Sequence, residues 1–293
     1  MNSPLEGLLE GNRLEQLDDN LFSGRCTWTP TKRLFGGELM SQSISAAQYT
    51  VPVDVYIHSF HAYFMLPGDP ARAVIYDVEN IRDGKSFLTR RVTARQHGQA
   101  IYSCQCSFQG QEDGISHQHQ TQLPEGPEGL TSDREIFSAM PRRVEKLIEA
   151  PIEYRQVSPI WSQKDLKAEP RNAVWMKADG ALPDDLKVHQ QLLAFASDTH
   201  LLATAARPHG INFMTAKMRA ATLDHSLWFH RPFRMDEWLL YELLSPWAGN
   251  ARGLSFGRIY DREGNLVASS AQEGMIRLQH ETETPAQDDL LTK

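Results

Sequence analysis

The chain of 293 residues carries the same order of predicted elements twice, and this duplication restricts its fold more than any other feature. In the first half, alternating residues up to Thr29 predict a strand, and the next elements are a helix over 36–50 and strands at 55–65, 72–81, 86–97 and 100–109. In the second half, the elements are a strand over 171–179, a helix over 186–204 and strands at 223–231, 237–246, 251–260 and 264–276. The repeated order predicts two copies of one structural unit.

Short stretches of sequence support the duplication. "HSFHAYFMLP" ends at Pro67 and "DHSLWFHRP" ends at Pro232, and each is followed by strands separated by a turn that contains Gly. One helix against a long, curved antiparallel sheet is an α+β unit. When two such units lie in tandem, pairing their sheets edge to edge covers an otherwise exposed sheet edge. We therefore expect two α+β units joined through their sheets.

Between the two units the composition changes. From Gly110 to about Ala168 the chain is rich in Pro, Gln, Glu and Gly, with one amphipathic helix predicted at 133–149. These changes divide the chain into four parts. They are an N-terminal unit over 1–112, a connecting segment over 113–168, a C-terminal unit over 169–280 and a tail over 281–293 that we expect to be disordered.

Composition restricts the class of protein. The chain is 41% hydrophobic and 23% charged, which is typical of globular proteins, and no apolar run is long enough to span a membrane. The N-terminal stretch lacks the basic-then-apolar order of a signal peptide, and three cysteines make no disulfide framework. A net charge of −7 argues against a nucleic-acid partner bound through a broad basic face. We therefore expect a cytoplasmic protein without a nucleic-acid partner.

Six stretches carry a resemblance to a known family. They are "RLFGGELMSQSISAA" (33–47), "HSFHAYFMLPGD" (58–69), "YDVENIRDGKSFLTRRVTA" (76–94), "VHQQLLAFASD" (188–198), "DHSLWFHRPF" (224–233) and "VASSAQEGMIR" (267–277). Over nearly its whole length, parts of 112–168 excepted, the chain resembles acyl-CoA thioesterase II, the double hot-dog family. The resemblance implies a tandem hot-dog fold and hydrolysis of fatty acyl-CoA to a free fatty acid and CoA. We also expect a homo-oligomer.

The resemblance also implies a set of catalytic residues. The family has an Asp on the second-half helix, a Thr or Ser before the "DHSLWFH" strand and a Gln on the last strand, which here are Asp198, Thr222 and Gln272. Asp198 would act as general base on a water, while the other two hold that water and polarise the thioester carbonyl. The first helix has no matching Asp, and Ser107 falls where Gln272 lies. We therefore expect one active site per chain.

Several of these residues have a structural reading too. Asp198 lies on a predicted buried helix, where an unpaired carboxylate is costly, but it could simply bond Ser197 or a backbone amide. Gly36 and Gly37 could present N–H groups to an oxyanion or phosphate, or only form a tight start to their helix. His58 could contact the oxyanion or CoA, or act as a base, although strand histidines often serve packing.

The strand at 223–231 and the basic residues near 90 can likewise be interpreted as functional or as purely structural. We expect Asp224 and His225 to fix the start of the strand, and Trp228 and Phe229 to line or back an acyl-facing core, with plain packing as the alternative. Arg90, Arg91 and Arg95 could bind CoA phosphates or form a solvated strand face.

Three other patterns resemble known sites but predict none. "GLSFG" (253–257) matches the G-x-S-x-G nucleophile motif, yet it lies inside a predicted strand rather than at a strand-to-helix turn, so Ser255 is not expected to be a nucleophile. "DGKS" (83–86) lacks the earlier Gly of a phosphate loop. Cys104, Cys106, His117 and His119 offer four possible metal ligands. However, alternate residues of a strand share a face for packing reasons too, and the two histidines lie in a predicted linker. We expect no metal and no cofactor, CoA being part of the substrate.

Two other functions remain open from the sequence. A hot-dog enoyl-CoA hydratase or dehydratase would need a His with a carboxylate placed for proton transfer. A non-catalytic acyl-CoA-binding module would need no base beside the thioester. The presence of Asp198, Thr222 and Gln272 together argues against the binding module.

Overall fold

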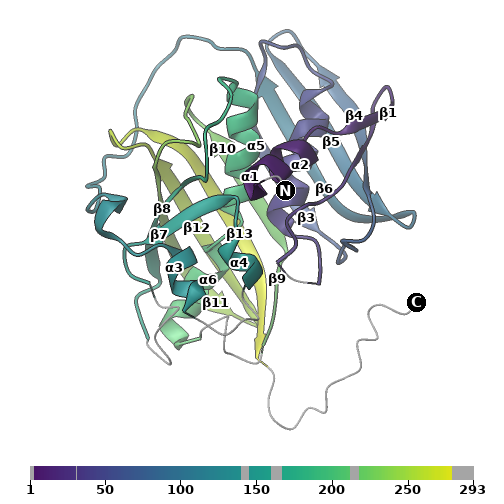
Figure 1. The fold of residues 1–293 in the computed structure, drawn as a ribbon. Helices are drawn as coiled ribbons and strands as arrows, with labels where there is room; N and C mark the ends of the chain where they lie inside the picture. Colours follow the sequence, from purple (N-terminus) through teal and green to yellow (C-terminus); the bar gives the residue numbers. More distant parts are fainter. Residues whose placement is uncertain (1–2, 31, 140–144, 160–166, 212–217, 279–293) are drawn as a thin grey trace.

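The computed structural model describes residues 3–30, 32–139, 145–159, 167–211 and 218–278. Its strands form one 13-stranded sheet in the order β1-β2-β4-β5-β6-β3-β10-β13-β12-β11-β8-β7, and β9 pairs with β13. The two halves join where β3 pairs antiparallel with β10, from Asp224 opposite Tyr63 to Trp228 opposite Ser59 (Figure 1). The predicted edge-to-edge pairing of the two sheets is confirmed.

The first unit contains the predicted helix and strands. Its elements are α1 (Pro4–Gly11), β1 (Glu15–Asp18), β2 (Leu21–Gly24), α2 (Gly36–Gln48), β3 (Tyr56–Phe64), β4 (Val74–Asp83), β5 (Phe87–Gln96) and β6 (Gln99–Gln109). The strand predicted before the helix is a pair of short strands. The turn between β5 and β6 has positive φ at His97 and Gly98, which is the backbone that a two-residue hairpin turn needs.

The second unit repeats the arrangement. Its elements are β8 (Arg171–Ala178), α5 (Leu186–Ser197), α6 (Leu201–Ala206), a 3-10 turn (Arg207–His209), β9 (Met218–Thr222), β10 (Asp224–Phe229), β11 (Leu239–Gly249), β12 (Arg252–Tyr260) and β13 (Leu266–Leu278). The prediction of one continuous helix over 186–204 is wrong. The first helix ends at Ser197, and His200 has φ 74, a left-handed conformation that no α-helix can accommodate.

The connecting segment contributes to the sheet of the second unit. Its described residues form a 3-10 turn (Pro127–Gly129), α3 (Asp133–Ser138), α4 (Glu145–Ile148) and β7 (Ile152–Gln156). The helix predicted at 133–149 falls on α3 and α4, with 140–144 outside the described residues. The sequence analysis missed β7, which pairs with β8 and extends the sheet (Figure 1). The tail predicted at 281–293 also lies outside the described residues.

Helices α2 and α5 pack together in the middle of the molecule, between the two halves of the sheet (Figure 1). Every residue of α2 after Gly36 is buried, which its small Ser and Ala side chains permit. One buried core includes side chains from both units, among them Phe60, Phe195 and Leu227. The two repeats therefore share a core. No helix in the described part of the chain is long and apolar enough to cross a membrane.

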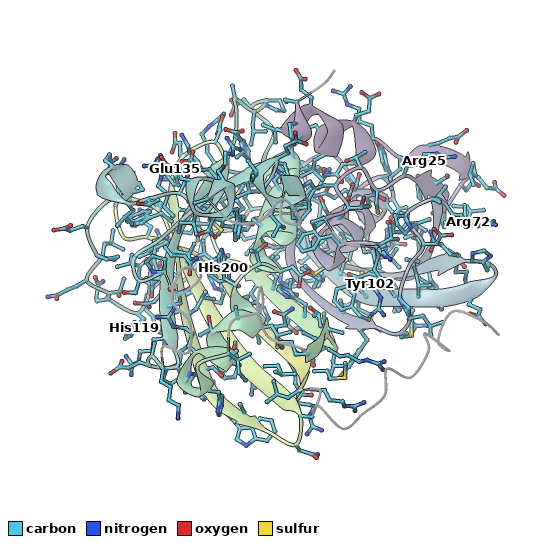
Figure 2. The ribbon with its side chains drawn as sticks, turned by 60° about the horizontal axis from the view of Figure 1, so that its bottom comes forward. Arg25, Arg72, Tyr102, His119, Glu135 and His200 are labelled. Atoms are coloured by element: carbon cyan, nitrogen blue, oxygen red, sulfur yellow. The ribbon has the colours of Figure 1, made fainter. Side chains whose placement is uncertain are left out.

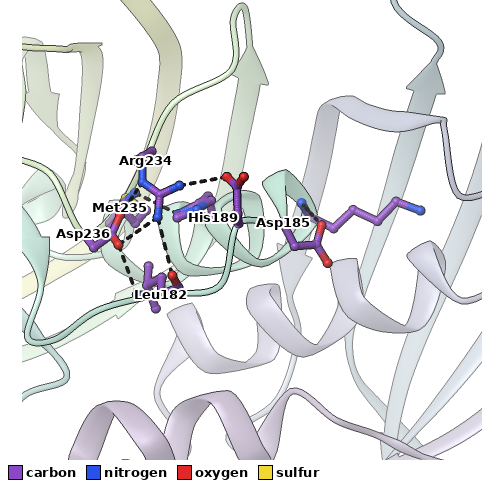
Figure 3. A network of polar contacts seen from close by, with 8 residues as sticks. Leu182, Asp185, His189, Arg234, Met235 and Asp236 are labelled. Carbon is purple, nitrogen blue, oxygen red and sulfur yellow. Dashed lines mark hydrogen bonds and ion pairs between the residues drawn. The ribbon is translucent and has the colours of Figure 1, made fainter.

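A polar network fixes the start of α5 (Figure 3). Asp185 caps the helix, and Arg234 binds Asp236 through two hydrogen bonds of 3.0 Å. The buried ring of His189 accepts a hydrogen bond of 3.0 Å from the backbone N–H of Met235 through Nδ1. These contacts anchor the end of α5 that lies opposite Asp198.

Candidate active site

Asp198, Thr222 and Gln272 meet in the second unit. The Gln272 Nε2 donates to Asp198 Oδ1 at 2.8 Å and to Thr222 Oγ1 at 2.8 Å. The Thr222 hydroxyl in turn donates to Asp198 Oδ1 at 3.2 Å. The three residues thus form one closed hydrogen-bonded set. They span 75 positions of the sequence and lie at a helix end and on two strands.

Two of the three side chains are brought together by strand pairing. Thr222 ends β9 and lies opposite Gly274 of β13, two positions beyond Gln272. The chain then continues along the same strand, because the N–H of Leu223 donates to the carbonyl of Glu273 at 2.9 Å. The side chain of Gln272 is only 1% exposed, so its amide is confined to the interior face of the sheet.

Buried side chains hold the end of α5 above these strands. The Tyr154 hydroxyl donates to the carbonyl of Ala196 at 3.1 Å, and the Tyr241 hydroxyl donates to that of Ser197 at 3.2 Å. His225 Nε2 lies 3.0 Å from the Ser197 hydroxyl, and burial lowers the pKa of this imidazole to about 3, so it is neutral. Side-chain hydroxyls therefore satisfy the last carbonyls of the helix and fix the backbone from which Asp198 projects.

Gly36 and Gly37 bring the start of α2 against Asp198. A Cβ on Gly36 would lie 2.6 Å from Asp198 Oδ2, and a Cβ on Gly37 would collide with the carbonyl of Phe195. The Gly37 N–H lowers the pKa of the Asp198 carboxylate, at the end of the helix where the dipole favours negative charge. The glycines therefore permit a close approach that any other residue would block. Their contact with an oxyanion or phosphate stays a prediction.

The environment of Asp198 makes its carboxylate a stronger base. Burial raises its pKa to about 6, and the hydrogen bonds from Gln272, Thr222 and Gly37 lower it only in part. The carboxylate is half-buried, because it lies on the wall of a cavity. The buried Gln272 Oε1 has no hydrogen-bond partner among the described residues. An unpaired buried acceptor beside a basic carboxylate suits an ordered water.

The cavity beside this set has a volume of about 360 Å³. Asp198, Thr222 and Gly36 form part of its polar wall. Its apolar wall includes Trp28 and Phe35 of the first unit, Phe137 and Ile152 of the connecting segment, and Leu202 of α6. An apolar cavity with a few convergent polar groups is the usual form of a small-molecule site.

His58 lies elsewhere. It projects from β3, and its Nε2 is 2.8 Å from the hydroxyl of Ser107. His58 lines a different cavity, together with Tyr56 and Arg231 and without Asp198. The structure therefore does not bring His58 to the other candidate residues.

The first unit has a different set of side chains at the position equivalent to this site. The prediction that Ser107 matches Gln272 is wrong by one residue. Cys106 is fully buried, as Gln272 is, whereas Ser107 is half-buried and lies against His58, so Cys106 is the residue on the interior face. A shift of one residue along a strand moves a side chain to the other face of the sheet.

The basic residues near position 90 have separate contacts. Arg90 is buried and donates from Nε to the Thr50 hydroxyl at 2.9 Å and from Nη2 to the Thr50 carbonyl at 3.0 Å, next to the end of α2. It therefore does not face solvent or a phosphate. Arg91 pairs with Glu79 at 2.9 Å, and Arg95 lines a shallow cavity away from Asp198.

The aromatic strand β10 divides its side chains between two faces. Trp228 is 37% exposed and its ring lies 5.2 Å from that of His61 on the outer face, so the expectation that it lines or backs an acyl-facing core is wrong. Phe229 is buried and stacks on Phe233. Asp224 accepts a hydrogen bond of 2.8 Å from the N–H of Glu273, which fixes the start of the strand as expected. The difference follows from the alternation of side chains along a strand.

Other residues around the site were missed by the sequence analysis. Asp133, His200 and Tyr154 line the cavity, and two of them come from the connecting segment. A signal for α3 was present, since Ser132 and Glu135 form the S-x-x-E capping box that begins this helix. Among the described residues, no three His, Cys, Asp or Glu side chains gather as a metal site.

Comparison with known proteins places the chain in a family. The family described as Acyl-CoA thioesterase matches residues 148–275, and the Acyl-CoA thioesterase N-terminal domain matches residues 25–109. The chain is 43% identical to acyl-coenzyme A thioesterase 8 of Mus musculus, covering 90% of this chain and 87% of that protein. It is 37% identical to acyl-CoA thioesterase 2 of Haemophilus influenzae, covering 94% and 99%.

Solved structures confirm the tandem hot-dog fold. The acyl-CoA thioesterase II TesB2 from Mycobacterium marinum is 36% identical, with a TM-score of 0.77 over 93% of this chain and 98% of that chain. A hot-dog protein of unknown function from Alicyclobacillus acidocaldarius is 14% identical, with a TM-score of 0.77 over 96% and 100%, and shares the fold alone. On this evidence the chain belongs to the acyl-CoA thioesterase II family.

Proposed function

We propose that this protein hydrolyses fatty acyl-CoA to a free fatty acid and CoA, through direct attack of a water held by Asp198, Thr222 and Gln272. The observation that carries the proposal is the closed hydrogen-bonded set of these side chains on the wall of a largely apolar cavity. Membership of the family supports the same substrate class.

The proposed reaction needs one base. The Asp198 carboxylate, with its pKa raised to about 6, takes a proton from the water as that water attacks the thioester carbonyl carbon. The tetrahedral intermediate then collapses, the carbon–sulfur bond breaks, and the CoA thiolate leaves and takes up the proton that Asp198 had accepted, which restores the carboxylate. Because Asp198 Oδ1 is occupied by Gln272 and Thr222, Oδ2 is the atom proposed to accept the proton.

The start of α2 is proposed to stabilise the oxyanion. Both hydrogens of the Gln272 amide already have acceptors, so another donor must meet the developing charge. The Gly36 N–H lies in the first turn of a helix whose N-terminus borders the cavity. Backbone donors placed in advance at such a position stabilise a developing oxyanion.

Hydration of an enoyl-CoA is the second candidate, because His200 and Asp133 also line this cavity. One comparison separates the functions. Purified protein is incubated with saturated acyl-CoAs of increasing chain length and with enoyl-CoA, and thiol release and loss of the enoyl double bond are followed separately. We expect thiol release. Hydration without thiol release would favour the hydratase, and binding without either reaction would favour the binding module.

Ser255→Ala is expected to fold and to keep most of its thioesterase turnover. Ser255 lies inside β12, opposite Gln272, and not at the strand-to-helix turn that a nucleophilic serine requires. Steady-state thiol release and mass spectrometry of the protein during turnover check this. An acyl group trapped on Ser255 would contradict direct attack by water.

Treatment with EDTA is expected to leave activity unchanged, because in the proposed mechanism a carboxylate, and not a metal-bound hydroxide, activates the water. Thiol release before and after dialysis against EDTA measures this. Activity that disappears on dialysis and returns with one added metal would contradict the proposal that no metal or other cofactor takes part.

We further propose that the protein works in the cytoplasm as a homo-oligomer. Apolar side chains exposed on the outer face of the sheet, among them Trp228, Trp247 and Phe256, are consistent with contact between copies. Light scattering of the purified protein measures the number of copies directly.

A further inference from the structure

The break between α5 and α6 decides where Asp198 points. A helix continuing through residues 198–200 would keep Asp198 among hydrogen-bonded turns, whereas here Asp198 is the last residue before the break. The break itself depends on His200, which has φ 74 and ψ −23. A left-handed conformation is costly for a residue other than Gly and persists only when the surrounding structure holds it.

The carboxylate of Asp133 on α3 lies in close contact with the ring of His200. The His200 Nε2 lies 3.2 Å from Asp133 Oδ2, and each residue is only 5% exposed. The other oxygen of Asp133 accepts a hydrogen bond of 2.8 Å from Gln156 Nε2. His200 therefore lies in the interior of the second unit (Figure 2), where its partner is itself held by a second buried side chain. Such buried polar pairs can specify one local conformation.

Tyr154 of β7 supports the same break. Its ring packs edge-on against the His200 ring, with 5.1 Å between the centroids. Its hydroxyl lies 3.2 Å from Thr199 Oγ1 and donates to the carbonyl of Ala196 at 3.1 Å. Residues before and after Asp198 are thus both held by the connecting segment.

We propose that Asp133 and His200 form a positioning pair, through which the connecting segment holds the helix break that presents Asp198 to the water. This inference rests on the proposed function, and it assigns the segment 113–168 a part in the active site. The pair acts on Asp198 through the backbone of 198–200. Both residues are therefore positioning residues, and their loss is expected to lower kcat more than it raises KM.

The test uses Asp133→Ala, His200→Ala and the double variant in the full-length protein. Each single change is expected to lower kcat by up to about 100-fold, the loss that a displacement of a catalytic group by 1 Å can cause. The double variant is expected to be no worse than the more damaged single variant, because both changes release the same break. Losses that multiply in the double variant would contradict a shared role.

The control is His189→Ala, which removes another buried, hydrogen-bonded histidine at the opposite end of α5. It is expected to lower thermal stability and to leave kcat of the folded protein nearly unchanged. An equal fall of kcat in this control would show that any damage to α5 suffices, and would overturn the specific role of the Asp133–His200 pair.

A conservative variant separates positioning from folding. His200→Asn introduces a residue type that tolerates the left-handed conformation and whose side-chain amide can donate to Asp133, so it is expected to recover much of the kcat lost in His200→Ala. Asp133→Asn serves in the same way if Asp133→Ala does not fold. Folded variants of either position with wild-type kcat would overturn the proposal.

Amide hydrogen exchange gives a readout that does not depend on catalysis. Exchange at residues 196–204 is expected to accelerate in Asp133→Ala and His200→Ala and not in His189→Ala, since only the first two release the break. Unchanged exchange in this stretch would contradict the inference. If the wild-type protein released no thiol from any acyl-CoA, the proposed function would fail, while the exchange result would still decide whether the pair holds the break.

Discussion

Asp198→Asn is expected to lower kcat by about 100-fold or more, the range associated with loss of a general base. The amide has nearly the shape of the carboxylate and cannot accept the proton of the attacking water. Steady-state thiol release on one acyl-CoA measures the loss, and circular dichroism and thermal unfolding measure whether the fold is kept. Wild-type turnover in the folded variant would remove Asp198 from the mechanism.

The expected stability of this variant follows from the direction of the pKa shift. The pKa of Asp198 rises from 3.8 to about 6 in the folded protein, so its ionisation opposes folding. This penalty is absent below pH 3.8, grows as the pH rises and is fully present above about pH 6. Since Asn does not ionise, the variant is free of this penalty at neutral pH. A large loss of stability would indicate that Asp198 has a structural role.

Thr222→Ala and Gln272→Ala are each expected to lower kcat/KM by about 10- to 1000-fold, near the scale for losing one donor that activates or stabilises the reacting groups. If the two residues and Asp198 hold one water, the first change already displaces it and leaves little for the second change to remove. The double variant should therefore lose far less than the product of the two single losses. Residual activity should rise with pH, because hydroxide partly replaces the missing activation.

The matched control for this cycle is Ser255→Ala combined with Thr222→Ala. Ser255 lies opposite Gln272 on the neighbouring strand, so its removal perturbs the same part of the sheet without removing a member of the hydrogen-bonded set. Its small effect should simply add to that of Thr222→Ala. If the Thr222 and Gln272 losses also added as independent free energies, the two residues would have separate roles, and the shared-water proposal would fail.

The duplicated order of elements was sufficient to predict the tandem sheets and their pairing, because apolar periodicity marks most strands of the two repeats. It could not predict the break at 198–200. The residues "SDTH" contain no Gly or Pro, and the left-handed His200 contacts Asp133, which lies 67 positions away in the sequence. A local pattern carries no information about such a partner.

For the site, too, the sequence identified candidate residues, but only the tertiary structure shows which of them lie together. The resemblance to the family placed Asp198, Thr222 and Gln272 on separate elements, and the structure shows that they bond to one another. Aligning the repeats by sequence pointed to Ser107, whereas its complete burial places Cys106 on the interior face. Sequence spacing could not fix that register, because it depends on how β6 pairs with its neighbours.

The pH dependence of kcat/KM, measured for the wild-type protein and for Asp198→Asn on one acyl-CoA, tests the general-base proposal most directly. A profile of kcat/KM reports the pKa of the essential base in the free enzyme. Since Asp198 must be ionised to accept a proton, wild-type kcat/KM is expected to rise with pH through about 6 and then level off. In Asp198→Asn this inflection should be absent. A wild-type profile with no inflection there, or an inflection that persists in the variant, would contradict the assignment of Asp198 as the base.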